Sequence, residues 1–357
     1  MHKDDQMTPK ERSKALSEGK DIDRLPIDLS LAVYGGDLIG VTNRELRSSA
    51  KVFAQSQIKA YELFGHDSLS TDFNLRSIPI ALGAQVSDPE TGIPAILVPP
   101  LKEINEIDNI DLSLLDIKYD KGLRKTYDGI NFIQDKVGDE VSVSISFTGP
   151  FTVASGLIGT EKLLKAVRKD EEGVFKLLDF CEKAIIQVAT NFKDLGLSVC
   201  IPDPVASGIV LGKKKFDKFV LPTTKRIVEK LKEINGPGIC YHICGDTTSI
   251  LSSMADAGMP AVSLDNAVDL EVAKKEIGDR VIIVGNVEPV KVVHSGTEKD
   301  VEEAIKTCFK KAYDSKLGYQ LGPGCDIPLG APIENIYKFM EVGRKCGKWP
   351  IDPKNFE

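Results

Sequence analysis

The stretch GICYHICGD, residues 238–246, is typical of a buried strand that ends in a Gly-Asp turn. Residues two apart on an extended strand point to the same side, so the His242 imidazole and the Cys244 sulfur can converge on one ion. A third soft ligand, Cys325, lies in the stretch YQLGPGCD, residues 319–326, which predicts another short strand followed by a Gly/Pro turn. Three protein ligands with an open fourth position are the pattern of catalytic zinc, whereas structural zinc sites usually have four. The sequence therefore predicts a zinc site made of His242, Cys244 and Cys325.

The strand that contains His242 belongs to a regular alternation of strand and helix along the chain. The other predicted strands are Ile27–Val33, Ser68–Asp72, Val141–Phe147, Leu197–Ile201, Ala261–Asp265, Val281–Asn286 and the stretch before Cys325. The clearest predicted helices are Asn43–Phe64, Thr160–Lys169, Glu172–Leu195 and Lys215–Ile234. About eight strands alternating with helices are typical of a parallel (β/α)8 TIM barrel. An open doubly wound sheet is the alternative, but the chain has no Gly-rich phosphate loop.

Two segments add to this alternation. Near the start, Thr8, Pro9 and Glu11 predict a capped helix that runs to about Glu18, so the barrel has an N-terminal helical extension. From Arg76 to about Tyr119, prolines interrupt short extended pieces. We expect this Pro-rich stretch to be an insertion over one mouth of the barrel, within a single domain that spans residues 1–357.

Polar residues follow the predicted strands at their carboxyl ends. They are Asp72, Asp203, His242, Cys244, Asp265, Asn286 and Cys325. Barrels of this class build their active sites on that face. The distribution therefore places the predicted zinc site and the other candidate residues at one end of the barrel.

Composition excludes several classes of function. The chain has 357 residues, of which 42% are hydrophobic and 28% charged, and its net charge is -7. This argues against a nucleic-acid partner, and the longest basic cluster, Lys213–Lys215, is short. No apolar run is long enough for a membrane span, and the amino terminus lacks the apolar region of a signal peptide. We therefore expect a cytoplasmic protein with no membrane partner, whose seven cysteines are reduced thiols.

Several motifs are similar to those of the uroporphyrinogen decarboxylase superfamily. They are MTPKER (residues 7–12), DRLP (23–26), FTGPFT (147–152), SLD (263–265) and GNVEP (285–289). Within the superfamily, the chain resembles the methylcobamide:coenzyme M methyltransferases in DPVAS (203–207), in His242-x-Cys244-Gly245 and in GPGC (322–325). Decarboxylases carry arginines after the first strand to bind the carboxylates of a tetrapyrrole, and the corresponding stretch here, YGGDLIG (34–40), has none. The resemblance therefore disfavours the decarboxylase reaction and implies that the three predicted ligands hold a catalytic zinc.

The resemblance also implies a reaction. A methyl group would pass from a methylated corrinoid to a small thiol acceptor such as coenzyme M. The corrinoid would be supplied by a partner protein, because the chain shows no Asp-x-His-x-x-Gly cobalamin motif of its own. A metal-independent decarboxylase acting on a porphyrinogen and a non-catalytic corrinoid or tetrapyrrole carrier are the alternatives. The sequence leaves the acceptor open among coenzyme M, another thiol and a pterin.

The chemistry of the predicted ligands suits this reaction. A free thiol has a pKa near 8.5, and coordination to zinc can deprotonate it. Two cysteinates and a neutral histidine already cancel the charge of the ion, so a bound substrate thiolate would leave about one net negative charge. Such a sulfur stays electron-rich enough to attack a methyl group, whereas an oxygen-ligated zinc is better suited to polarise water or carbonyls.

Further residues are assigned as candidates. Asp265 is expected to orient His242 or the substrate, and Asp203 is a second catalytic candidate, with a helix cap and a rigid turn as their respective structural alternatives. The residues expected to bind substrate are Asn286, Asp72, Tyr34 and Ser207. The remaining cysteines are interpreted as small buried hydrophobic residues or incidental surface thiols, although Cys240 shares the spacing of His242 and Cys244.

Overall fold

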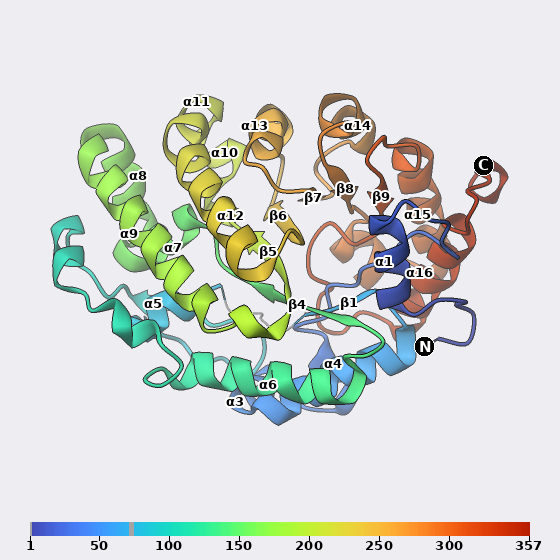
Figure 1. The fold of residues 1–357 in the computed structure, drawn as a ribbon, viewed down its shortest axis with the longest axis horizontal. Coiled ribbons are helices and arrows are strands. Elements are labelled where there is room, and N and C mark those ends of the chain that lie inside the picture. Colours follow the sequence, from blue (N-terminus) through green and yellow to red (C-terminus); the bar gives the residue numbers. More distant parts are fainter. Residues whose placement is uncertain (1, 71–74) are drawn as a thin grey trace.

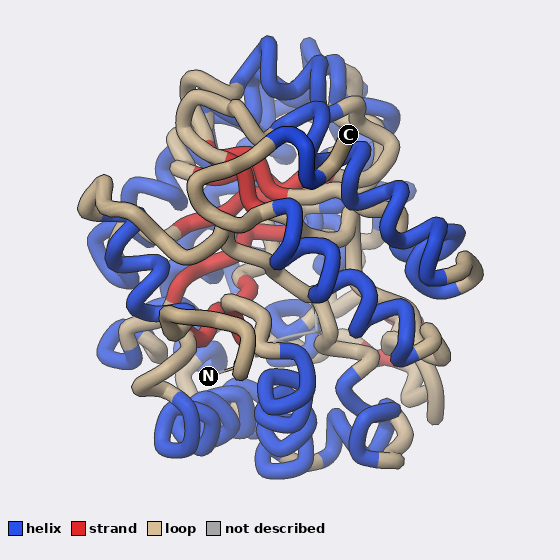
Figure 2. Tube along the Cα trace, turned by 90° about the vertical axis from the view of Figure 1, so that its right-hand side faces the viewer, coloured by secondary structure: helices blue, strands red, loops and turns tan. Residues whose placement is uncertain are grey.

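A computed structural model describes residues 2–70 and 75–357. Within these residues it contains a curled parallel sheet of seven strands, in the order β1-β4-β5-β6-β7-β8-β9, surrounded by helices (Figures 1 and 2). The strands are β1 (Ser68–Ser70), β4 (Ser142–Ser146), β5 (Ser198–Pro202), β6 (Ile239–Ile243), β7 (Ala261–Leu264), β8 (Ile282–Val284) and β9 (Tyr319–Gln320). Their order follows the chain, as in a TIM barrel, and the predicted fold class is confirmed.

The segment predicted as the first strand closes the sheet without forming a full strand. Ile27 makes an isolated parallel bridge to Leu321. The Asp28 N–H donates to the Leu321 carbonyl (2.8 Å) on one side, and the Asp67 N–H donates to the Ile27 carbonyl (2.9 Å) on the other. Because Leu321 follows β9 and Asp67 precedes β1, these bonds join the two edges of the sheet. The predicted strand over Ile27–Val33 is wrong beyond its first residues.

The chain leaves the predicted strand early because helix α2 (Gly35–Ile39) packs closely on helix α4 (Ala50–Phe64). A side chain at Gly35 would come within 2.7 Å of the Ser56 hydroxyl, so only glycine allows this approach. The Gly35 N–H already donates to the Leu31 carbonyl (2.8 Å) in a helical turn. The carboxyl-terminal half of the predicted strand therefore serves as the entry to α2.

The helices form the outer layer. They are α1 (Pro9–Ser17), α3 (Asn43–Ser48), α4 (Ala50–Phe64), α5 (Ser77–Ala81), α6 (Lys121–Val137), α7 (Pro150–Ile158), α8 (Thr160–Lys169), α9 (Glu171–Thr190), α10 (Gly208–Leu211), α11 (Lys213–Lys215), α12 (Leu221–Asn235), α13 (Leu251–Asp256), α14 (Leu270–Ile277), α15 (Glu298–Ala312) and α16 (Ile333–Cys346). No helix within the described residues is long and apolar enough to cross a membrane.

Three predicted helices differ from the sequence expectation. The long helix predicted over Asn43–Phe64 is two helices, because Ser49 adopts an extended backbone and its side chain caps the second. The helix predicted to begin at Lys215 first makes a π-helical turn, Phe216–Val220, just before Pro222, which supplies no N–H. The helix predicted over Glu172–Leu195 ends at Thr190 and is followed by a short 3-10 turn.

The predicted Thr8 cap of α1 is confirmed, with Glu11 completing the capping box.

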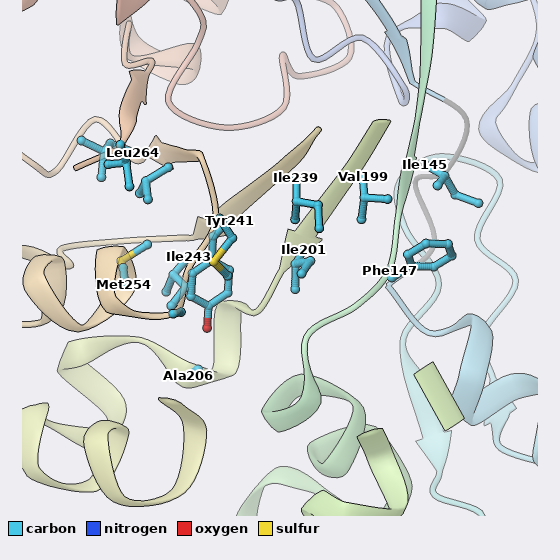
Figure 3. Close-up of a cluster of buried hydrophobic side chains, with 14 of the residues drawn as sticks. Ile145, Phe147, Val199, Ile201, Ala206, Ile239, Tyr241, Ile243, Met254 and Leu264 are labelled. Carbon is cyan, nitrogen blue, oxygen red and sulfur yellow. The ribbon is translucent and has the colours of Figure 1, made fainter. Parts of the chain in front are cut away.

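Alternation along the strands divides the side chains between two environments. On β5 and β6, Val199, Ile201, Tyr241 and Ile243 are buried against the surrounding helices (Figure 3). The residues between them face the barrel interior, which is polar near its carboxyl end. The hydrophobic layer between sheet and helices therefore supplies the core, while the interior face is left for the site.

The Pro-rich segment from residue 76 to 119 packs against the helices on one side of the barrel. It contains α5, the antiparallel pair β2 (Gln85–Val86) and β3 (Ile96–Val98), and two 3-10 turns. Pro79 and Ile96 lie against Gly156 of α7, where a side chain would come within 2.6 Å of Pro79. Because α7 begins just after the carboxyl end of β4, this segment lies beside the face that carries the candidate site.

The N-terminal extension is held at the opposite end by a buried ion-pair network. Its members are Asp5, Arg12, Asp23, Arg24, Asp67 and Arg344, each at most 11% exposed in its side chain. Arg12 binds Asp23 through two hydrogen bonds (2.7 and 2.8 Å) and reaches Asp67 with its remaining nitrogen. Asp67 directly precedes β1 and also accepts from the Ile27 N–H (2.7 Å). Through Asp5, which pairs with both Arg12 and Arg344, the network therefore ties α1 and α16 to the start of the barrel.

Asp23 should make folding stability sensitive to acid. Burial opposes its ionisation, but the Arg12 hydrogen bonds dominate and hold the pKa of Asp23 at about 2, below its ordinary value of 3.8. A carboxyl with a depressed folded-state pKa stabilises the fold above its unfolded pKa, and this stabilisation is lost as the pH falls toward the folded value. The difference in unfolding free energy between the wild type and Asp23→Asn, measured in urea, should therefore shrink between about pH 4 and pH 2. A difference that stays constant across this range would show that Asp23 does not titrate as described.

Candidate metal centre

Three side chains converge at the carboxyl ends of β6 and β9. The His242 Nε2 atom lies 3.3 Å from the Cys244 sulfur, and the Cys244 sulfur lies 4.0 Å from the Cys325 sulfur. All three ligand atoms lie within 4.8 Å of one another, and no other group of three His, Cys, Asp or Glu side chains in residues 2–70 and 75–357 does so. The three predicted ligands are therefore brought together by the fold.

Two glycines allow this convergence. Gly245, directly after Cys244, has a φ of +80°, so the chain turns out of β6 there. Gly324, directly before Cys325, lies so close to the loop after β7 that a side chain would come within 2.5 Å of the Asn266 nitrogen. Glycine at this position lets the Cys325 turn reach the neighbouring strands.

The two sulfurs differ in their affinity for a proton. A hydrogen bond from Cys244 lowers the pKa of Cys325 to about 4 against the opposing effect of burial, and His242 and the Asp326 N–H lower it further. The same hydrogen bond, together with burial, raises the pKa of Cys244. Cys325 is thus the more acidic of the two thiols. A divalent cation can replace the protons between these atoms, and the Cys2His donor set is one that zinc favours.

The His242 ring lies against a residue that sequence analysis did not assign. The His242 Nδ1 atom lies 3.1 Å from the Ser263 hydroxyl oxygen. Asp265, the residue expected to orient His242, instead accepts from the Gly245 N–H (2.8 Å) and the Ala267 N–H (2.9 Å). Asp265 therefore lies beside the candidate ligand Cys244 and holds the turn that follows it. The signal that could have identified Ser263 is its register opposite His242, which requires the strand pairing to be known.

Asn286 contacts the backbone of Asp265 rather than the three candidate ligands. Its side-chain amide donates to the backbone carbonyls of Asp265 (2.9 Å) and Val268 (2.7 Å), and its carbonyl oxygen faces the Cys308 sulfur at 3.8 Å. The amide nitrogen therefore holds the loop after β7, while the amide oxygen faces α15, which contains Cys308. Its predicted role in substrate binding is not represented among these contacts.

Asp203 is not brought to the metal centre. It continues the alternation of Val199 and Ile201, so its side chain points to the helix layer, where it is fully buried. It accepts from the Thr152 N–H (2.7 Å) and the Thr152 hydroxyl (2.6 Å) at the start of α7. Burial raises the pKa of Asp203 to about 6, and the Thr152 bonds oppose this shift. The contacts are those of a residue that links the loop after β5 to α7.

Two other predicted substrate residues, Ser207 and Tyr34, form hydrogen bonds to groups other than the three candidate ligands. Ser207 caps α10, accepting from the Val210 N–H (3.4 Å), in a loop that packs beside the segment leaving Cys244. The Tyr34 hydroxyl donates to the Ala331 carbonyl (3.1 Å), and burial raises the pKa of Tyr34 to about 12. Asp72 lies outside the described residues.

Polar residues of the first barrel segment also line the interior near Cys325. The Ser30 hydroxyl donates to the Asp326 carboxylate. Burial raises the pKa of Asp326, and the neighbouring charge of Cys325 adds to this shift. Burial likewise raises the pKa of Asp28 to about 6. Sequence analysis did not assign these residues. Nothing in the local sequence around Asp28 and Ser30 indicates that this segment lies next to Cys325 in the fold.

The family model described as uroporphyrinogen decarboxylase (URO-D) matches residues 8–346, nearly the whole chain. The chain belongs to this family.

Within the family, the chain is similar over most of its length to named methyltransferases. It is 28% identical over 342 residues to the methylcobamide:CoM methyltransferase MtbA of Methanosarcina acetivorans, covering 94% of this chain and 98% of that protein. It is 27% identical over 340 residues to the methylcobamide:CoM methyltransferase MtaA of Methanosarcina barkeri, covering 93% and 96%. A uroporphyrinogen decarboxylase of Prochlorococcus marinus is 30% identical, but over 70% of this chain and 71% of that protein. The predicted resemblance to the methyltransferase branch of the family is confirmed.

A solved structure supports the fold of this family member independently. A methyltransferase from Methanosarcina mazei superposes with a TM-score of 0.83 at 24% identity, covering 95% of this chain and 98% of that one.

Proposed function

We propose that this family member is a zinc-dependent methyltransferase that moves a methyl group from a methylated corrinoid, carried by a partner protein, to a thiol such as coenzyme M. The observation that carries the proposal is the convergence of His242, Cys244 and Cys325 at the carboxyl ends of the strands. The similarity to relatives named for methylcobamide and CoM, over 94% of the chain, supports the choice of donor and acceptor.

The donor set fits zinc. His242, Cys244 and Cys325 would hold the ion through one nitrogen and two sulfurs, which are soft or borderline donors. Three protein ligands leave a position for a substrate, as in catalytic zinc sites. Zinc bound there would lower the pKa of a coordinated acceptor thiol, so that its sulfur is a thiolate at neutral pH.

The protein's own residues hold and orient this arrangement. The Ser263 hydroxyl lies 3.1 Å from Nδ1 of His242, and the Asp265 carboxylate accepts a hydrogen bond from the Gly245 N–H in the turn after Cys244. The backbone of Asp326 helps to lower the pKa of Cys325. Placing the reacting sulfur in one position lowers the entropic cost of the encounter with the methyl donor.

The transfer balances without a further reactant. A lone pair on the acceptor sulfur forms the new sulfur–carbon bond, and the carbon–cobalt bond breaks with both electrons remaining on cobalt. The products are a thioether and the corrinoid with cobalt reduced from the +3 to the +1 state. The proton of the acceptor thiol leaves when the thiolate forms.

Free methylcobalamin and coenzyme M provide a direct assay of the proposed function. Purified zinc-loaded protein should convert the absorbance spectrum of methylcobalamin to that of the demethylated corrinoid only when thiol is present. Protein treated with a chelator should lose this activity and regain it on addition of zinc. Porphyrinogen decarboxylation that persists in chelator-treated protein would contradict the proposal, as would corrinoid binding without methyl loss in the zinc-loaded protein.

A further inference from the structure

A histidine can bind a metal through either ring nitrogen, and the partner of the other nitrogen selects between them. In this protein the two nitrogens of His242 face different groups. Nε2 faces the sulfur of Cys244 at 3.3 Å, while Nδ1 faces the hydroxyl oxygen of Ser263 at 3.1 Å. The environment of the ring is therefore asymmetric before any metal is considered.

The Ser263 contact is built into the sheet rather than into a loop. His242 and Ser263 are directly paired residues of the parallel strands β6 and β7, and both point to the barrel interior. Directly opposed side chains on neighbouring strands lie close enough to interact. The distance between Nδ1 and the hydroxyl is thus set by the register of the two strands.

We propose that Ser263 is a positioning residue that fixes His242 as an Nε2 metal ligand. The inference rests on the zinc site of the proposed function and adds a residue to it. The Ser263 oxygen accepts a hydrogen bond from Nδ1–H, and this leaves the lone pair of Nε2 directed toward the position between the two sulfurs. In this role Ser263 acts only through His242.

The partner of His242 is also neutral, and this bears on the charge of the site. Metal-bound histidines are often paired with a carboxylate, which raises the basicity of the ring. The carboxylate of Asp265, directly after β7, instead accepts hydrogen bonds from the N–H groups of Gly245 and Ala267. A serine hydroxyl orients the ring without adding negative charge. The electron density available to an acceptor sulfur is then governed by Cys244 and Cys325.

Two substitutions test the role of Ser263. Ser263→Ala removes the hydroxyl and should weaken zinc binding by about 10- to 100-fold, the range found for partners of metal-bound histidines. Ser263→Thr keeps the hydroxyl on a side chain suited to a strand and should restore affinity to within a few-fold of the wild type. Ser198→Ala, on the inward face of the neighbouring strand β5 but near its opposite end, is the matched control and should leave affinity unchanged.

Zinc affinity is measured by competition with a chromophoric chelator, without substrate or corrinoid. Nitrogen-15 NMR of the imidazole rings in zinc-loaded protein supplies a second readout, since it reports which nitrogen of His242 carries the proton. The proposal predicts a protonated Nδ1 in the wild type and in Ser263→Thr. Wild-type affinity in Ser263→Ala, or a zinc-bound Nδ1 in the wild type, would overturn the role of Ser263 while leaving the proposed function intact. Absence of zinc binding in the wild type would overturn both.

Discussion

Zinc binding and methyl transfer should both collapse in Cys325→Ala, while the far-ultraviolet circular dichroism spectrum stays that of the wild type. Cys325 is the ligand farthest in sequence from the other two, and it supplies the sulfur whose pKa is lowered to about 4. Its removal leaves two ligands, so zinc affinity should fall by more than about 100-fold, beyond the effect of losing an outer partner. The fold should persist because the hydrophobic layer between strands and helices does not depend on the site.

Two further variants sharpen this experiment. Cys325→Ser keeps the size of the side chain but offers a hydroxyl, which zinc binds poorly, so it should behave like Cys325→Ala. Cys200→Ala is the matched control. Cys200 is also a free cysteine of the barrel interior, and it lies opposite the free cysteine Cys240 in the register of β5 and β6. It should retain zinc and activity. Full zinc content and full methyl transfer in Cys325→Ala would show that another residue completes the site with His242 and Cys244.

Arg12→Ala should destabilise the fold by about 3–5 kcal/mol, as expected when one member of a buried ion-pair network is removed. The Arg12 side chain is completely buried and is bound by Asp23 and Asp67. Without the guanidinium, both carboxylates remain buried with fewer partners, and the Asp67 contact between α1 and the start of β1 is weakened. The measurement is the free energy of unfolding in urea at neutral pH.

The matched control for Arg12 is Arg226→Ala. Arg226 also binds two carboxylates, Asp179 and Glu182, but its side chain is 44% exposed. Exposed ion pairs contribute about 0–1 kcal/mol, so this variant should unfold close to the wild type. If the two variants lost equal stability, burial of the Arg12 network would not be what makes it important.

The sequence contained enough information to predict the fold class and to select three candidate ligands that the fold brings together. His242 and Cys244 are two residues apart on a strand, and this period alone places them on one face. The same period could have corrected the assignment of Asp203, because it follows Val199 and Ile201 at even spacing and therefore points with them to the helix layer. For Asp203, the side of the strand on which a residue lies was therefore a better guide to its environment than its position at the end of the strand.

Other parts depended on contacts that no local pattern contains. The pairing of His242 with Ser263 follows from the register between β6 and β7, and the position of Asn286 behind Asp265 follows from the path of the loop after β7. The strand predicted from Ile27 ended early because Gly35 allows α2 to pack against Ser56. In each case, a tertiary contact decided between structures that the local sequence allows equally.

X-ray absorption at the zinc edge, with and without acceptor thiol, tests the central claim most directly. The account predicts one zinc per chain with two sulfur neighbours at about 2.3 Å and a nitrogen neighbour at about 2.0–2.1 Å, from Cys244, Cys325 and His242. Addition of the thiol should add a third sulfur at about the same distance, because the acceptor takes the open position. A zinc with only nitrogen and oxygen neighbours, or a sulfur count that does not change with thiol, would contradict the account.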